Sequence, residues 1–133
     1  MEIDKIKAFL TTLLFGLAFL SCDFHPFYKE NETVLFQINN VGNSAYALIL
    51  VYAKDSLNNY VDSTPSQGNL PSSDGVSLGI TLSKLKDVKD GVFEAQVTML
   101  SGKFLSKEFG VIDGLKTRQK FKVDLKDSTI VIR

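Results

Sequence analysis

The sequence predicts an all-β sandwich. Apolar residues recur at every second position over short stretches from Thr33 onward, which is the period of a half-buried strand. Segments rich in Gly, Asn, Ser and Asp separate these stretches about every eight to twelve residues, as turns do. The 112 residues after position 21 are enough to enclose one hydrophobic core without cross-links.

The first half of this region predicts two strands and a long connection. Residues 33–38 alternate, with Val34, Phe36 and Ile38 on one face, and 39–43 supply a turn. Residues 46–53 are apolar on both faces and rich in β-branched and aromatic side chains, which favours a central strand. The polar stretch 54–75 holds two of the three prolines and predicts a long loop, with 59–62 as a short edge strand.

The second half alternates more regularly. We expect the connection 83–91 to direct Leu85 and Val88 toward the core, and Ser101 and Gly102 to form a tight hairpin turn. Residues 118–125 show the clearest alternation, with apolar side chains inward and charged ones outward. The strands expected after the loop are 76–82, 92–100, 103–109, 118–125 and 128–132.

About seven strands in 100 residues are typical of a sandwich of the immunoglobulin or fibronectin III type. Leu85, Gly91 and Phe93 resemble the Leu, Gly and aromatic residue that come before strand F in fibronectin-like modules. A small closed β-barrel is the alternative fold for the same pattern.

Composition excludes several classes of protein. Fifteen Lys and Arg balance fifteen Asp and Glu, which argues against a nucleic-acid-binding protein. The single Cys excludes a disulfide framework within the chain and a cysteine-based zinc cluster. The only imidazole, His25, lies outside the expected domain, and no phosphate-binding loop or dinucleotide motif occurs. We therefore expect no cofactor and no enzymatic activity.

The first 22 residues form a separate unit. The apolar run 8–20 would span about 20 Å as a helix, short of the roughly 30 Å hydrocarbon core of a bilayer, and fits the hydrophobic region of a signal peptide. The run ends at Ser21 and Cys22. The alternative interpretation is an ordinary secretory signal or an uncleaved anchor in which Cys22 is incidental.

Residues 1–22 resemble the signal peptide of bacterial lipoproteins. The residues directly before Cys22 follow a relaxed form of the pattern that precedes the acylated cysteine in those proteins. The resemblance implies that residues 1–21 are removed and that Cys22, acylated, becomes the first mature residue. Residues 22–32 would then be a lipid-anchored tether and residues 33–133 the sandwich domain. The expected location is the bacterial cell envelope, at the outer membrane or cell surface, with the inner membrane as the alternative.

Charge is distributed unevenly along the chain. Residues 22–102 carry five basic and nine acidic groups, whereas residues 103–133 carry eight basic and four acidic ones. Arg118, Lys120 and Lys122 share one face of one expected strand. They predict either a solvated face or a docking surface for an acidic protein, a glycan or lipid headgroups.

The loop 54–75 offers a second candidate surface, because binding residues favour loops held on rigid sheets. Tyr60, Leu57 and Leu70 are its candidate partner contacts; the alternative is a loop without a binding role. The oxygen-rich set Asp55, Asn58, Asn59 and Asp62 is a less favoured calcium site.

Two carboxylate pairs, Asp87 with Asp90 and Asp124 with Asp127, lie beside expected turns, where Asp usually bonds to the backbone. Asp87 and Asp90 leave a carboxylate-dependent hydrolase as a remote alternative. The favoured function is a non-catalytic binding domain that contacts the membrane through its lipid and binds a protein or glycan, not nucleic acid. A periplasm-facing accessory subunit of an envelope complex is the second interpretation.

Overall fold

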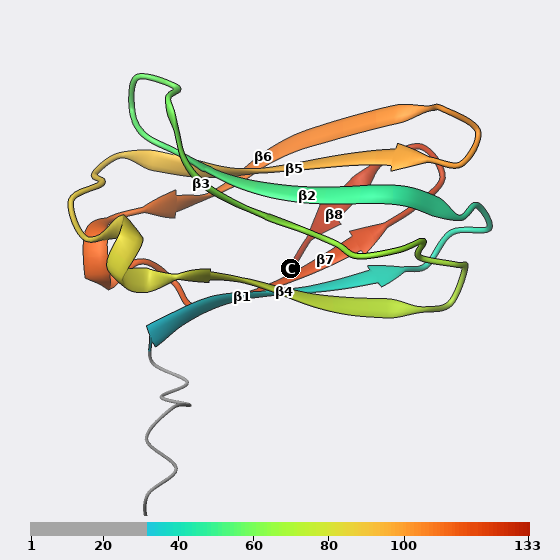
Figure 1. The fold of residues 1–133 in the computed structure, drawn as a ribbon, viewed down its shortest axis with the longest axis horizontal. Coiled ribbons are helices and arrows are strands. Elements are labelled where there is room, and N and C mark those ends of the chain that lie inside the picture. Colours follow the sequence, from blue (N-terminus) through green and yellow to red (C-terminus); the bar gives the residue numbers. More distant parts are fainter. Residues whose placement is uncertain (1–31) are drawn as a thin grey trace, which may run out of the picture. The chain divides into compact units, whose positions relative to one another are not determined.

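The computed structural model describes residues 32–133, which fold into two four-stranded β-sheets packed face to face (Figure 1). The all-β sandwich is therefore confirmed, and the closed barrel is excluded because the two sheets remain separate. The expected signal segment 1–21 and residues 22–31 of the expected tether lie outside the described residues.

Eight strands form where about seven were expected. The strand order is β4-β1-β7-β8 in one sheet and β3-β2-β5-β6 in the other. The strands are β1 (Thr33–Asn40), β2 (Tyr46–Lys54), β3 (Tyr60–Pro65), β4 (Gly75–Thr81), β5 (Gly91–Met99), β6 (Phe104–Ile112), β7 (Lys120–Leu125) and β8 (Ile130–Ile132).

The strands are connected as in immunoglobulin domains, except that one position in the sheet is filled by a different strand. Strands β1 to β6 pair as strands B, C, C′, E, F and G pair in immunoglobulin domains. The position beside strand B, which strand A fills in those domains, is taken by β7, which runs parallel to β1 from Leu35↔Lys120 to Asn40↔Leu125. Strand β7 therefore lies inside its sheet, between β1 and β8.

The core lies between the two sheets. Inward-facing residues of every second position are buried on β1, β5 and β7, as the period-two pattern predicts. Four phenylalanine rings from four strands meet at its centre, with closest centroid distances of 5.0 Å for Phe36–Phe93 and 5.3 Å for Phe109–Phe121. Such edge-to-face contacts add to the free energy of burial.

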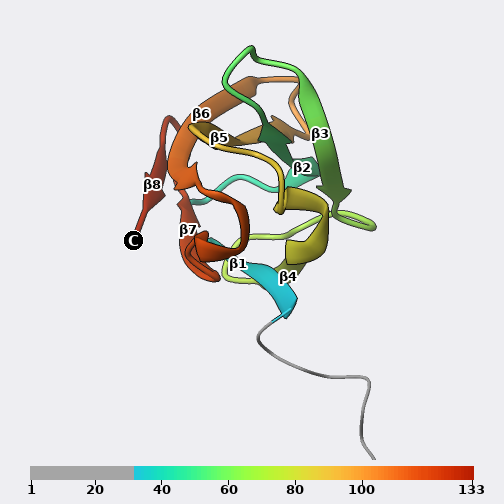
Figure 2. The same ribbon diagram turned by 90° about the vertical axis from the view of Figure 1, so that its left-hand side faces the viewer.

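One end of the sandwich carries the start of β1 and three connections (Figure 2). These are the β2–β3 turn, the segment with the 3-10 helix η2 (Leu82–Leu85), and the one with η3 (Gly114–Lys116). The last two are joined by a 2.7 Å hydrogen bond from the amide of Gly114 to the carbonyl of Val88. A side chain at Gly114 would clash, because its φ is +53° and a Cβ would lie 2.9 Å from the Lys86 carbonyl oxygen.

The region 54–75 differs from the expected long loop. Strand β3 continues to Pro65, so the remaining connection is residues 66–74. Within it Leu70 exchanges backbone hydrogen bonds with Tyr46 and is only 6% exposed. Leu70 is therefore part of the core, and its interpretation as a partner contact was wrong.

Asp127 ties the β7–β8 turn to the turn after β1. Its Oδ1 accepts hydrogen bonds from the backbone amides of Asn43, at 2.9 Å, and Ser44, at 3.0 Å. The bonds from Ser44 and then Asn43 lower the pKa of this carboxyl group below its ordinary value of 3.8.

Replacing Asp127 should therefore give a pH-dependent loss of stability. The carboxylate stabilises the folded state fully above the unfolded pKa of 3.8, and this contribution is lost as pH falls through the lower folded pKa. We expect Asp127→Asn to reduce the free energy of unfolding at about pH 7, with the difference from wild type shrinking toward about pH 2.5. Urea titrations at both pH values test this, and a pH-independent difference would contradict it.

Candidate functional site

The β2–β3 turn, residues 55–59, is held in a fixed shape by Asp55. Its Oδ1 accepts hydrogen bonds from the backbone amides of Leu57 and Asn59, each at 2.9 Å, and its Oδ2 accepts one from the Asn59 side chain at 3.2 Å. These bonds, the Asn59 amide first, lower the pKa of Asp55. Asn58 adopts the left-handed conformation, with φ at +63°, that Asn tolerates. The turn therefore presents its tip on a preorganised frame.

Two of the expected contact residues lie on this hairpin and face solvent. Leu57 at the tip is 79% exposed, the most exposed large apolar side chain in residues 32–133. Tyr60, at the start of β3, is also exposed and packs on Tyr52 of β2, with ring centroids 4.6 Å apart. An exposed apolar tip beside a supported aromatic ring is typical of a contact surface for a protein or a sugar.

A cleft of about 550 Å³ lies between this hairpin and the segment that joins η2 to β5. Leu57, Val61 and Val88 give it apolar walls, while Asp87 and two lysines line it as well. The lining residues are Asp55, Ser56, Leu57, Val61, Lys84, Asp87, Val88 and Lys89. Asp90, the expected companion of Asp87, is not among them and adopts a turn conformation with φ at +55°.

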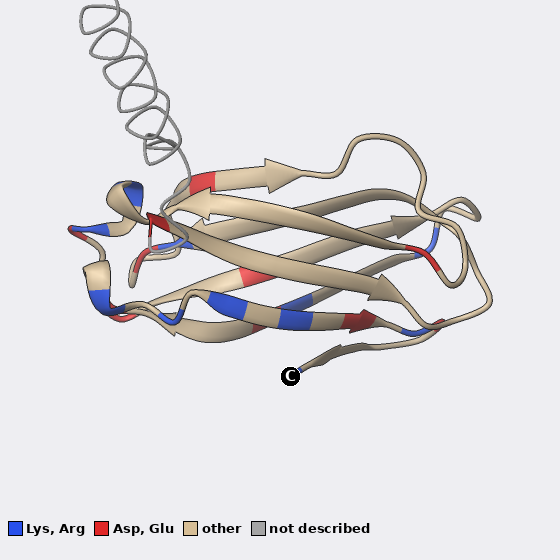
Figure 3. Cartoon of the chain, turned by 90° about the horizontal axis from the view of Figure 1, so that it is seen from below, with Lys and Arg blue, Asp and Glu red and all other residues tan. Residues whose placement is uncertain are grey.

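A second surface is the outward face of the sheet β4-β1-β7-β8, here called the basic face. Figure 3 looks onto it and shows basic segments along β7, beside the short strand that ends at the C-terminus. Lys120 and Lys122 are exposed on it and make no ion pair within residues 32–133. Their neighbours on β1 are Leu35 and Gln37, followed on β4 by Gly79 and Ser77.

Arg118 and Arg133 modify the expected row of cations. Arg118 precedes β7, and its guanidinium lies 4.8 Å from the ring centroid of Phe121, so it does not extend the row straight along the strand. Arg133, which was not among the expected site residues, pairs through its backbone with Lys122 and joins the face. Its side chain binds Asp124 through two contacts of 3.0 and 3.2 Å. Within residues 32–133, Arg118, Lys120 and Lys122 form no ion pair.

The opposite sheet carries an ion cluster that sequence reasoning missed. Lys54 is only 6% exposed, and its Nζ lies 2.6 Å from Glu94 and 2.5 Å from Glu108. Hydrogen bonds to Glu108 and Glu94 raise the pKa of Lys54 to about 12. Burial opposes ionisation of Glu94, but hydrogen bonds from Lys54 and Gln96 outweigh it and lower the pKa of Glu94.

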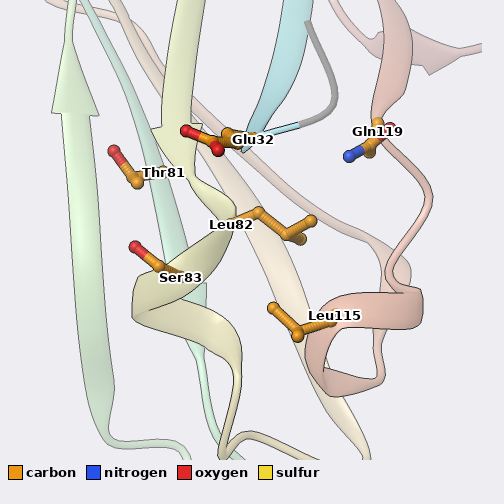
Figure 4. A pocket seen from close by; sticks show the side chains of 6 residues that line it. All are labelled: Glu32, Thr81, Leu82, Ser83, Leu115 and Gln119. Carbon is orange, nitrogen blue, oxygen red and sulfur yellow. The ribbon is translucent and has the colours of Figure 1, made fainter. Parts of the chain in front are cut away.

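A pocket of about 500 Å³ opens where the chain enters β1 (Figure 4). Leu82 and Leu115 form its apolar part, and Glu32, Thr81, Ser83 and Gln119 its polar rim. Leu115 stands at the tip of η3 with 63% of its surface exposed. The pocket offers hydrogen-bonding groups and apolar surface, with Glu32 as its one titratable side chain.

The expected calcium ligands do not form one cluster. Asp55 is used by its own turn, and Asp62 on β3 faces Lys84 at 3.7 Å. Within residues 32–133 no three His, Cys, Asp or Glu side chains are grouped to hold a metal ion.

The same residues contain no helix long and apolar enough to cross a membrane. Cys22 lies outside the described residues, so its acylation stays a prediction.

Fold and surfaces together define a β-sandwich with two candidate binding surfaces. No protein-family model matches the chain, and no curated protein is similar to it. Among solved structures, a protein from Eubacterium rectale determined by NMR is similar over 80% of this chain and 91% of its own, with 14% identity and a TM-score of 0.51. That similarity supports the fold alone.

Two further structures match more loosely. The membrane-binding domain of pneumolysin has a TM-score of 0.39 at 8% identity, over 76% of this chain and 96% of that one. The human-specific toxin intermedilysin has a TM-score of 0.40 at 9% identity, over 76% of this chain and 22% of that one.

Proposed function

We propose that this protein is a lipoprotein of the bacterial cell envelope whose sandwich domain binds a protein or glycan partner without catalysing a reaction. The observation that carries the proposal is Cys22, placed directly after an apolar run that is too short to span a bilayer. Ten residues further on, at Glu32, begins a part of the chain that has a complete core of its own. A lipid anchor followed by a tether and a folded domain suits display at a membrane surface.

The β2–β3 hairpin is the proposed partner-binding surface. It combines the exposed Leu57, the supported ring of Tyr60 and the adjacent cleft. These features bring apolar contact area, a stacking platform and hydrogen-bonding groups onto one rigid turn, which lowers the entropy lost on binding. A periplasm-facing accessory subunit would use the same surface on a larger complex.

The remote hydrolase alternative would require Asp90. If Asp90→Asn changes neither turnover nor phenotype, this alternative loses its support.

Acylation of Cys22 is the first expected result. Native protein expressed in a bacterial host should begin at Cys22, carry a mass increase from acyl chains, and partition into detergent. Cys22→Ala should lose both properties, because the only thiol of the chain is removed. Intact-mass measurement with detergent partitioning tests this. An unmodified product that keeps residues 1–21 would contradict the proposal.

Partner contact at the hairpin is the second expected result. A photo-crosslinking residue at position 57 should give a defined adduct in intact cells, and Leu57→Ser or Tyr60→Ser should weaken the yield from a neighbouring site such as position 56. The matched control uses Leu100→Ser and Phe104→Ser, similarly exposed apolar residues at or near the β5–β6 turn. Equal losses from both pairs would argue against the hairpin as the contact.

A further inference from the structure

We propose that the basic face lies against the anionic headgroups of the membrane that holds the Cys22 lipid, so that the hairpin faces away from the bilayer. This inference rests on the proposed lipid anchor and adds an orientation to it. Its basis is the position at which the chain leaves the domain, the opposite charge of the two sheet faces, and the composition of the basic face.

The exit point restricts the position of the domain. The described chain begins at Glu32, directly before β1, and β1 belongs to the sheet that carries the basic face. Ten residues, 23–32, separate Cys22 from β1, and they reach at most about 35 Å when fully extended. A nine-residue strand such as β2 is itself about 30 Å long, so the tether holds the sandwich within roughly its own length of the headgroups.

The two outer sheet faces differ in charge. The outward strand positions of the basic face carry three charged residues, all on β7, and Arg133 follows directly after β8. With Lys120, Lys122 and Arg133 positive and Asp124 negative, their net charge is +2. The corresponding charged residues on the other sheet are Lys54, Glu94 and Glu108, a net charge of −1. An anionic surface therefore attracts one face of the sandwich and repels the other.

The remaining residues of the basic face suit a headgroup layer better than a protein partner. Its neutral positions are hydroxyl, amide or glycine residues together with Leu35 and the half-buried Val131, and no aromatic side chain is exposed there. Protein interfaces usually depend on buried aromatic or arginine anchors, and Arg133 is already bound to Asp124. Two free lysines on a flat polar surface instead attract phosphate groups through charge without requiring a matching shape.

Leu115 adds an apolar contact at the end where the chain enters β1. It lines the same pocket as Glu32 and stands beside Lys116 at the tip of η3. An exposed leucine next to a lysine can sit at the boundary between headgroups and acyl chains, while the lysine stays at the phosphates.

The β2–β3 turn belongs to the other sheet, and Figure 1 shows it rising away from the β1–β4–β7 layer.

Site-resolved lysine acetylation of the acylated protein tests the orientation. The protein, with its acyl mass confirmed, is added to preformed vesicles of phosphatidylcholine alone or with about one third phosphatidylglycerol, and treated with a membrane-impermeant acetylating reagent. We expect Lys120 and Lys122 to react about fivefold more slowly on the anionic vesicles, with the protection lost at high salt. Lys89, exposed in the η2–β5 connection beside the hairpin cleft, serves as the matched control and should react equally on both.

Each outcome decides the proposal. Equal reactivity of Lys120 and Lys122 on both kinds of vesicle overturns the orientation while leaving the lipid anchor intact. Protection of Lys120 and Lys122 by heparin but not by anionic vesicles identifies an acidic glycan as the partner of the basic face and also overturns it. A protein that carries no acyl group removes the anchor, and the orientation fails together with the proposed function.

Discussion

Phe36→Ala should lower the free energy of unfolding by about 3–5 kcal/mol, the largest effect we expect from any single substitution in the described domain. The Phe36 ring is fully buried on β1, and it contacts Phe93, Phe109 and Phe121 from three other strands. Removing the ring leaves a cavity at the point where the two sheets meet. The other rings cannot collapse into it without moving a strand.

The matched control is Leu35→Ala, one residue earlier on the same strand but directed to solvent. Urea denaturation should show a smaller loss than Phe36→Ala, because Leu35 is 36% exposed and lies outside the core between the two sheets. Similar losses at both positions would mean that the four-ring cluster does not hold the two sheets together.

Lys54→Met should lower the free energy of unfolding by about 2 kcal/mol at neutral pH. Glu94 would remain in a mostly buried position without its counter-charge, whereas Glu108 is more than half exposed and would be solvated by water. The pKa of Lys54, about 12, lies above its ordinary value of 10.5. The contribution of Lys54 is therefore complete below pH 10.5 and is lost as pH rises through about 12.

A comparison of Lys54→Met, Glu94→Leu and the double variant by urea denaturation isolates the pair. We expect the double variant to recover much of the loss, because it removes the unpaired buried charge together with its partner. Lys86→Met, at an exposed site without an ion pair in the described chain, is the control. Strictly additive losses would show that Lys54 and Glu94 act independently.

Local periodicity was sufficient to locate most strands. The alternation in 33–38, 92–100 and 118–125 reports which side of a sheet each residue faces, and that depends on the strand alone. The position of Leu70 could not be read in this way. A single leucine in a polar segment has no period, and a backbone pairing with Tyr46, 24 residues away, decides its burial.

Arg133 and Lys54 could not be predicted for the same reason as Leu70. Arg133 joins the basic face only because β8 turns back against β7, which places it opposite Lys122. Lys54 ends an apolar run and gives no sign of Glu94 and Glu108, which come from two other strands. Strand register is a property of paired segments, so a clustering that spans strands is not visible in either segment by itself.

The parallel pairing of β7 with β1 has a consequence for the order of folding. Leu35 pairs with Lys120 across 85 residues, so β1 lacks one of its two neighbours until β7 is available. A nascent chain released gradually can form the β2–β5 and β5–β6 pairs early, but its other sheet stays incomplete until residues 120–132 emerge. Long-range closure of this kind is slow. The sheet β4-β1-β7-β8 is therefore completed only when residues 120–132 are available to pair.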